Sequence, residues 1–351
     1  MRTRSQPSWD TPGTFEVASG VHRIPLPLPG DGLKAVNVYA IEDGDGLALV
    51  DTGSFRPESI AALEQGLSAL DAGLTDITKV LATHAHYDHY GLAAKIRASS
   101  GAEVVIGDQE TKLLGVAIDD DSFNRWVEHR RQWLGRHGAG ALLDAIEGFE
   151  RRHQLDTVRD SGRWEPPDRL LADGETVRLH SRTLHVHWTP GHTRGHIVYH
   201  DRANGLLFAG DHVLPHITPS LGFEPFADGR ALELFLGSLA AIRDLPVHSV
   251  LPGHGPEFAD LAGRVDALVE HHRVRLATCV SVISGEGARS ADAVARQLTW
   301  TSRGRSFSEL DPFNRMLAVT ETVTHLEWLV ESGRLQRNRA PDDTLAYALA
   351  A

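Results

Sequence analysis

Cysteine is almost missing from this sequence, since Cys279 is the only one among 351 residues. A single cysteine forms no intrachain disulfide and excludes a metal site built from several thiolates. Long hydrophobic runs are missing too, because none approaches the roughly 20 apolar residues that a membrane-spanning helix needs. Residues 1–13 are polar and lack the apolar core of a signal peptide, so we expect a flexible N-terminus and a cytoplasmic protein.

Positive charge is in short supply as well. The chain has 35 Lys and Arg against 47 Asp and Glu, a net charge of −12. This negative net charge argues against a broad surface that binds nucleic acid or anionic membranes. A local basic groove is the one such site that it allows. The 41% of hydrophobic residues can bury a large core, and the length fits one large domain and one small domain.

One short stretch concentrates residue types that bind metals. Residues 83–89 read Thr-His-Ala-His-Tyr-Asp-His and follow a short apolar run that is typical of a buried strand. His84 and His86 are two residues apart, so they point the same way on an extended chain. Asp88 and His89 begin a helix, where the chain turns and presents a second pair of ligands. Because imidazole and carboxylate suit Zn, Mn or Fe, we interpret this stretch as a metal site rather than a polar loop.

The same pattern recurs near the ends of later predicted strands. His192 lies in a tight loop rich in Pro and Gly, Asp211 ends a strand, and His254 lies between two glycines. With the first four residues they make seven ligands, enough for two metals with three ligands each and one shared carboxylate. We interpret His196 as a residue that supports a ligand or packs, because metal-binding histidines need such supports.

Strand and helix patterns alternate through the first part of the chain, and several strands are apolar throughout, as in sheets buried on both faces. Residues 15–24 predict one strand, and residues 36–41 and 47–50 predict two more. Residues 108–165 interrupt this alternation with amphipathic helices. We interpret these helices as packed on the core; the alternative is a lid that gives a substrate an apolar wall.

These motifs, in this order, resemble the metallo-β-lactamase superfamily, in particular its glyoxalase-II-like hydrolases. The resemblance covers roughly residues 15–275. It implies an α/β (α+β) fold, the αββα sandwich, in which two mixed sheets lie face to face with helices outside and the site at one edge. The catalytic domain would span residues 14–260. Five motifs carry the resemblance: Asp51-Thr52-Gly53, residues 83–89, Gly191-His192-Thr193, Gly210-Asp211 and Gly253-His254-Gly255.

The resemblance also implies roles for the candidate ligands. Asp51 would orient the site without binding metal. Asp211 stands where some true β-lactamases have a cysteine, which fits the non-lactamase hydrolases. The implied cofactors are two divalent ions, Zn²⁺ in the first place, with Mn and Fe as alternatives. The implied ligands form two groups of three and one bridge: His84, His86 and His192; Asp88, His89 and His254; and Asp211.

Residues 261–351 resemble the C-terminal part of the branch often called β-lactamase-like protein 2. In that branch a long helix leads into a small winged-helix-like domain. Here the long helix would span residues 261–283, and further helices would span residues 291–298 and 313–332. Winged helices often bind nucleic acid, but residues 264–351 hold eleven Arg and eleven Asp and Glu. With no basic footprint, we expect packing or homodimerisation rather than a nucleic-acid partner.

The predicted chemistry is hydrolysis by a hydroxide that bridges two metal ions. Asp88 would accept or shuttle the proton. We favour a thioester of the acyl-CoA or hydroxyacylglutathione type, because a thiolate leaves without strong acid help and the insertion with Trp126 and Trp133 suits an acyl chain. The alternatives are an endoribonuclease or phosphodiesterase, and a lactonase with Tyr87 or Tyr39 as pocket hydroxyls. A metal-binding regulatory module without activity is the non-enzyme alternative, although such relatives usually lose ligands.

Overall fold

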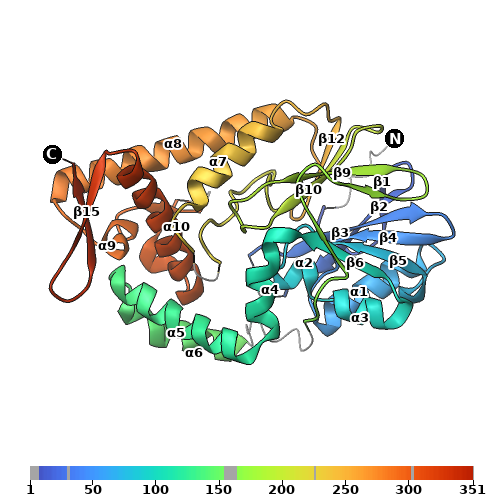
Figure 1. The fold of residues 1–351 in the computed structure, drawn as a ribbon, viewed down its shortest axis with the longest axis horizontal. Coiled ribbons are helices and arrows are strands. Elements are labelled where there is room, and N and C mark those ends of the chain that lie inside the picture. The colour runs from blue at the N-terminus through green and yellow to red at the C-terminus, as the bar shows by residue number, and fades with distance from the viewer. Residues whose placement is uncertain (1–7, 30–31, 154–163, 225–226, 302–303, 351) are drawn as a thin grey trace, which may run out of the picture.

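Two β-sheets packed face to face form the body of the protein, with helices on their outer sides (Figure 1). The computed structural model describes residues 8–29, 32–153, 164–224, 227–301 and 304–350. Within them the arrangement is the predicted αββα sandwich. Residues 1–7 of the expected flexible N-terminus lie outside the described residues, and none of the described helices is long and apolar enough to cross a membrane.

The first sheet has seven strands in sequence order. Its first four strands pair antiparallel, and the strands from β4 to β7 pair parallel. The prediction of one strand over residues 15–24 is wrong, because Gly20 adopts a φ of 66° and turns the chain into a hairpin of β1 and β2. The strands are β1 (Phe15–Ala18), β2 (Val21–Pro27), β3 (Ala35–Asp43), β4 (Gly46–Val50), β5 (Ile77–Leu81), β6 (Glu103–Gly107) and β7 (Arg169–Leu171).

The second sheet has five strands in the order β12-β11-β10-β9-β8. Only β11 and β12 pair parallel; the other neighbours pair antiparallel. All residues of β10 and β11 are buried, the apolar run of β11 as well as His200 and Asp201 at the end of β10. The strands are β8 (Thr176–Arg178), β9 (Thr183–Trp188), β10 (Ile197–Asp201), β11 (Leu206–Gly210) and β12 (Ser249–Pro252).

Three apolar layers hold the sandwich together. The middle layer lies between the sheets and includes Tyr39, Leu81 and Phe208. A second layer joins the first sheet to its helices, and a third joins the second sheet to α7 and α8. The helices over the two sheets are α1 (Pro57–Ser68), α3 (Ala93–Ser100), α4 (Thr111–Ile118), α7 (Ala231–Ile242) and α8 (Leu261–Glu286), and the short helical turns are η1 (Leu74–Asp76), η2 (Asp108–Glu110), η3 (Gly140–Leu142) and η4 (Phe307–Glu309).

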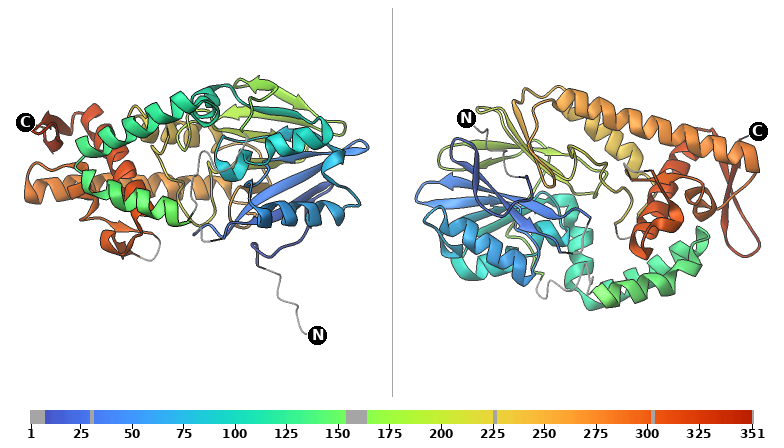
Figure 2. Two further views of the ribbon diagram at one scale, coloured as in Figure 1. Left: turned by 90° about the horizontal axis from the view of Figure 1, so that it is seen from below. Right: turned by 180° about the vertical axis from the view of Figure 1, so that it is seen from behind.

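The helical insertion packs against the C-terminal part of the chain. It holds α4, α5 (Asp120–Arg136) and α6 (Leu143–His153), and α6 and the turn η3 contact α10 (Pro312–Glu331), near which the insertion lies in Figure 2. Leu134 and Ile146 are buried in the same apolar cluster as Leu326 of α10. This packing agrees with the interpretation that we favoured. Residues 154–163 of the insertion lie outside the described residues, and the lid role stays a prediction.

The C-terminal part of the chain consists of three helices and two short hairpins among the described residues. The long helix α8 is followed by α9 (Ala291–Ala295), α10 and a hairpin of β15 (Leu335–Arg339) and β16 (Leu345–Leu349). A second short hairpin pairs β13 (Thr299–Trp300) with β14 (Arg305–Ser306). The likeness of this region to a winged helix and the homodimer stay predictions.

Candidate metal centre

The candidate ligands lie at one edge of the sandwich, where several strands end. Asp51 follows β4, residues 83–89 follow β5, Asp211 follows β11 and His254 comes just after β12. His192 lies in the loop between β9 and β10, and the short helix α2 (Tyr87–Tyr90) carries Asp88 and His89 (Figure 1). Because loops at the carboxyl ends of neighbouring parallel strands converge, segments far apart in the sequence meet here.

The first group of donors is His84, His86 and His192. Nε2 of His84 lies 3.0 Å from Nδ1 of His86. Nε2 of His192 lies 3.1 Å from the same Nδ1. Around one tetrahedral zinc ion with Zn–N bonds of about 2.0–2.1 Å, the nitrogens would be roughly 3.3 Å apart. The three nitrogens are therefore spaced as the ligands of a single ion.

The second group is Asp88, His89 and His254, and Asp211 connects it to the first. Nε2 of His254 lies 3.4 Å from Oδ2 of Asp88, and Nε2 of His89 lies 3.7 Å from it. Asp211 reaches His89 with Oδ1 at 3.5 Å and His254 with Oδ2 at 3.5 Å. Its Oδ2 also lies 3.6 Å from Nε2 of His192 in the first group. One carboxylate thus faces both groups.

Hydrogen bonds fix the orientation of three of these rings. A nitrogen that contacts a carbonyl or carboxylate oxygen must donate, so the other nitrogen of the neutral ring carries a lone pair. The donor is Nδ1 each time, which turns Nε2 and its lone pair toward the centre. The three bonds run from His254 to the Ala35 carbonyl (2.7 Å), from His192 to the Ser220 carbonyl (2.8 Å) and from His89 to Oδ2 of Asp51 (2.7 Å).

Several donor atoms of the site have no hydrogen-bond partner among the described residues. They are Nε2 of His89, Nε2 of His254 and Oδ1 of Asp211, and all three are buried. A buried polar atom without a partner lowers the stability of the fold by about 1–3 kcal/mol. Three such atoms at one point therefore indicate that a ligand binds there. Imidazole nitrogens and carboxylate oxygens are donors for divalent cations such as Zn²⁺. The residues present therefore fit metal ions.

The electrostatics of the site favour positive charge. Burial and the neighbouring His192 lower the pKa of His86 to about 3, so its ring is neutral and offers a lone pair. Burial opposes protonation of His89 as well, but the carboxylates of Asp51, Asp88 and Asp211 raise its pKa to about 9. The carboxylates that hold a proton on His89 would stabilise a metal cation in its place, and the neutral ring of His86 would offer that cation a lone pair.

Asp51 contacts the loop of candidate ligands from a strained backbone. Its φ of 60° is uncommon for a residue other than glycine. Oδ1 of Asp51 accepts from the Thr83 N–H at 2.8 Å, and Oδ2 accepts from His89. The next residue, Thr52, donates to the His89 carbonyl through both N–H and Oγ1 at 2.8 Å. Asp51 thereby ties β4 to the loop that carries the first four ligands.

His196 supports Asp211. Its Nε2 accepts from the Asp211 N–H at 3.1 Å, and its Nδ1 lies 2.9 Å from Oγ1 of Thr189. Both ring nitrogens are therefore engaged within the protein. The structure places His196 beside Asp211, and its supporting role at a metal centre stays a prediction.

Two residues of β3 hold the loop around His254. Asn37 donates from Nδ2 to the Pro252 carbonyl at 3.0 Å and to the Gly255 carbonyl at 2.8 Å. Tyr39 donates its hydroxyl to Pro252 as well and is only 2% exposed, so it is a structural donor and not the pocket hydroxyl that we predicted. We missed Asn37, although a lone amide inside an apolar strand is a usable signal of such a role.

The other predicted pocket residues are spread out. Tyr87 is half-buried and packs against the apolar layer beneath the first sheet. Trp126 is 7% exposed, and its ring packs near Phe123 and Arg130. Trp133 lines a cavity beside the C-terminal hairpin, and the described residues that line it include none of the seven ligands. The structure therefore does not bring the two tryptophans together with the metal ligands.

Glu110, which we missed, connects the two loops that hold the first group of ligands. It is 1% exposed and accepts hydrogen bonds from Oγ1 of Thr193 and from the backbone N–H groups of Ala85 and Gly195. A Cβ at Gly195 would lie 2.2 Å from the Glu110 nitrogen, so this close approach requires glycine. Burial raises the pKa of the Glu110 carboxyl to about 8.

The pKa of Glu110 predicts how stability changes with pH. Since the folded-state pKa lies above the unfolded one, the protonated carboxyl stabilises the protein at low pH, and this stabilisation is lost as pH rises through about 8. From pH 6 to 8 the wild type should lose about 2–3 kcal/mol of unfolding free energy relative to Glu110→Gln. Denaturant unfolding of both proteins measures the difference, and parallel pH profiles would contradict it.

Comparison with known proteins agrees with this geometry. The family model described as "Metallo-beta-lactamase superfamily" matches residues 31–254, which include all seven candidate ligands. The chain belongs to this superfamily. The fold of a superfamily member from Thermus thermophilus matches with a TM-score of 0.78 at 28% identity, covering 95% of this chain and 100% of that one. A β-lactamase domain protein from Burkholderia ambifaria matches with a TM-score of 0.81 at 28% identity, covering 96% and 94%.

Curated relatives in the superfamily include proteins with hydrolase names. The β-lactamase-like protein 2 homolog of Caenorhabditis elegans is 26% identical over 76% of this chain and 72% of its own length. The acyl-coenzyme A thioesterase MBLAC2 of Gallus gallus is 29% identical over 64% of this chain and 72% of its own. A hydroxyacylglutathione hydrolase of Fuscovulum blasticum is 27% identical over 63% and 66%. These relatives support the prediction of a metal-dependent hydrolase.

Proposed function

We propose that this superfamily member is a two-metal hydrolase that cleaves thioesters. The observation that carries the proposal is the position of Asp211, whose carboxylate faces His192 of one donor group and His89 and His254 of the other. One ion would be held by the first group and one by the second, with Asp211 shared between them. The nitrogen and oxygen donors favour Zn²⁺ in both positions.

The two ions, when bound, would supply an activated water and polarise the carbonyl oxygen of the substrate. Asp88 would accept a proton from the attacking water. Burial opposes ionisation of Asp88, but His89 and His254 lower its pKa, so the carboxylate is charged at neutral pH. The hydrogen bonds described above would hold the rings of His89, His192 and His254 in place, so these donors need little reorganisation during the reaction.

A site with two metal ions and the Asp88 carboxylate suits a thioester better than an ester with a poor leaving group. A thiol with a pKa of about 8.5 leaves as the thiolate without a general acid, and the proposal assigns no such acid to the site. The names of two relatives, an acyl-coenzyme A thioesterase and a hydroxyacylglutathione hydrolase, point to the same bond. Lactones and phosphodiesters are the competing substrates, and a metal-binding module without activity is the competing role.

A substrate panel tests the proposal. We expect kcat/KM for an acyl-CoA or an S-acylglutathione to exceed that for a lactone and for an RNA phosphodiester by at least about 100-fold, a difference of roughly 2.7 kcal/mol in activation free energy. Initial rates with the zinc-loaded full chain measure these ratios. A lactone or phosphodiester that reacts as fast as the thioesters would refute thioester specificity, and two bound metals without turnover of any substrate would favour the binding module.

A further inference from the structure

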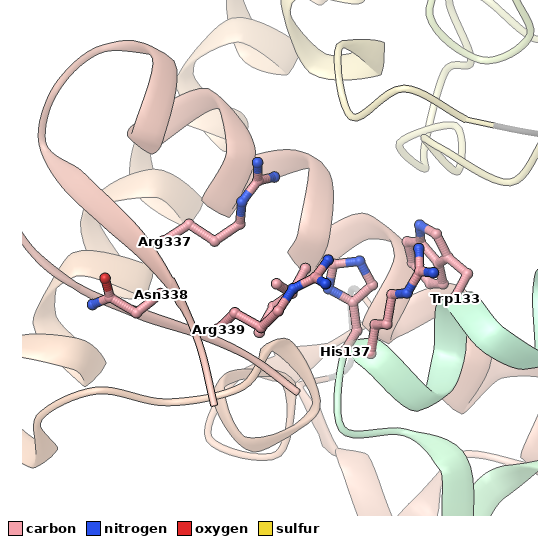
Figure 3. A pocket seen from close by; sticks show the side chains of 7 residues that line it. Trp133, His137, Arg337, Asn338 and Arg339 are labelled. Atoms are coloured by element: carbon pink, nitrogen blue, oxygen red, sulfur yellow. The ribbon is translucent and has the colours of Figure 1, made fainter. Parts of the chain in front are cut away.

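A cavity lies between the C-terminal end of α5 and the hairpin of β15 and β16 (Figure 3). Its volume is about 330 Å³. Trp133, Arg136 and His137 line it from the end of α5, and Arg337 and Arg339 line it from β15. Neither the metal centre nor the proposed hydrolysis uses these side chains.

The cavity gathers positive charge in a chain whose net charge is −12. Arg337 pairs with Glu327 at 2.7 Å. Arg136 and Arg339 share one carboxylate, that of Asp343, at 3.4 Å and 2.9 Å. The carboxylate of Glu331 also acts on Arg337. The excess of positive charge therefore lies beside Arg136 and Arg339, where two guanidinium groups share the single carboxylate of Asp343 among the described side chains.

His137 adds a buried group without a partner. It is 4% exposed, and its Nδ1 has no hydrogen-bond partner among the described residues. Burial and the nearby Arg337 and Arg136 lower the pKa of His137 to about 4, so the ring is neutral at neutral pH. Its centroid lies 4.3 Å from that of the Trp133 ring. The cavity thus has two flat ring systems beside its guanidinium groups.

Three of the four carbonyl groups in the last turn of α5 are satisfied within the chain. The carbonyls of Trp133, Leu134 and Gly135 accept hydrogen bonds from the N–H groups of the residues that follow the helix. These bonds are those of a helix that ends at a left-handed glycine, and they reduce the negative charge that the helix end presents to an anion. Gly138, with a φ of 81°, supplies that conformation.

We propose that this cavity binds a nucleoside phosphate. The guanidinium groups of Arg136 and Arg339 would pair with phosphate oxygens, for which their planar donors are suited. The rings of Trp133 and His137 would pack against the base. Asp343, in the turn between β15 and β16, occupies the anion position in the structure and would be displaced by the phosphate. A volume of about 330 Å³ lies in the range of small-ligand sites.

Isothermal titration of the zinc-loaded full chain with ADP at low salt tests the proposal. We expect saturable binding that weakens at least about tenfold in Arg136→Gln and in Arg339→Gln, because each loses charge-assisted hydrogen bonds. Asp343→Asn should bind ADP several-fold more tightly, since it weakens the competing carboxylate. Arg178→Gln, at an exposed position of β8, is the matched control and should bind like the wild type.

Four outcomes would overturn the proposal. The first is no binding at about 1 mM ADP, which is weaker than most functional sites. The second is an affinity for adenosine or for inorganic phosphate equal to that for ADP. Equal binding of adenosine would remove the role of the arginines, and equal binding of phosphate would remove the role of the two rings. The third is unchanged affinity in the Arg136→Gln/Arg339→Gln double variant; if chelation then abolished binding, ADP would sit at the metal centre. The fourth is an RNA oligonucleotide that binds more tightly than ADP and with a steeper salt dependence.

Discussion

Replacing Asp211 with alanine is expected to lower kcat/KM for the best thioester by at least about a thousandfold. The carboxylate faces His89, His192 and His254, so its loss removes a donor from both groups at once. Metal ions contribute several kcal/mol to the stabilisation of the transition state, and about 4 kcal/mol corresponds to a thousandfold in rate. Steady-state kinetics at matched zinc concentration measure the loss.

The control for this variant is His180→Ala. His180 is exposed and lies between β8 and β9, where its N–H donates to Asp43 at the opposite end of the sandwich from the ligands. It should retain the activity and unfolding temperature of the wild type. An Asp211→Ala protein that keeps more than about a tenth of wild-type kcat/KM would show that Asp211 does not hold the centre together.

Removal of the metal ions should abolish turnover and destabilise the fold. Without ions, the buried Nε2 atoms of His89 and His254 and the Oδ1 of Asp211 lack partners. An ion present at about 1,000 times its dissociation constant stabilises the folded state by roughly 4 kcal/mol, so chelation should lower the unfolding temperature by on the order of 10 °C. Calorimetry and activity before chelation, after chelation and after return of Zn²⁺ measure both effects.

Addition of Zn²⁺ should restore both turnover and unfolding temperature, which separates metal loss from irreversible unfolding. His180→Ala should behave like the wild type throughout. Full thioester turnover by a protein shown to be free of metal would mean that hydrolysis does not need the metal ions. An unfolding temperature that chelation leaves unchanged would mean that the unpartnered atoms carry no metal.

The residues that come together at the centre could be named from the sequence because each follows a local signal. His84, Asp211 and His254 come directly after apolar runs that form buried strands, and such strand ends meet at one edge. The folded structure brings all seven candidates into overlapping groups, in each of which the donor atoms lie within 4.8 Å of one another. Local pattern was sufficient here because strand order and strand ends determine the site.

The supporting residues could not be predicted in the same way, because their partners are distant in the sequence. Asn37 contacts Pro252 across 215 positions, and Glu110 contacts Thr193 across 83. A glutamate at the start of a helical stretch looks like a surface residue until the fold buries it. The three-residue strand β7 was missed because so short a segment has no measurable periodicity.

Side-chain direction limited the other assignments. The amphipathic pattern of the insertion identified its apolar face, but the pattern does not say which surface that face meets. Trp133 therefore looked like a substrate contact, whereas the structure places it beside the C-terminal hairpin. Tyr39 lies on a strand that alternates between two buried layers, so its hydroxyl had to find a backbone partner inside the core.

The metal content of the purified chain tests the central claim most directly. Inductively coupled plasma mass spectrometry after dialysis against metal-free buffer should find two divalent ions per wild-type chain. The same measurement should find at most one ion in Asp211→Ala, because both donor groups lose their shared carboxylate. Fewer than one ion in the wild type, or two ions retained in Asp211→Ala, would contradict a centre of two metals held by seven residues.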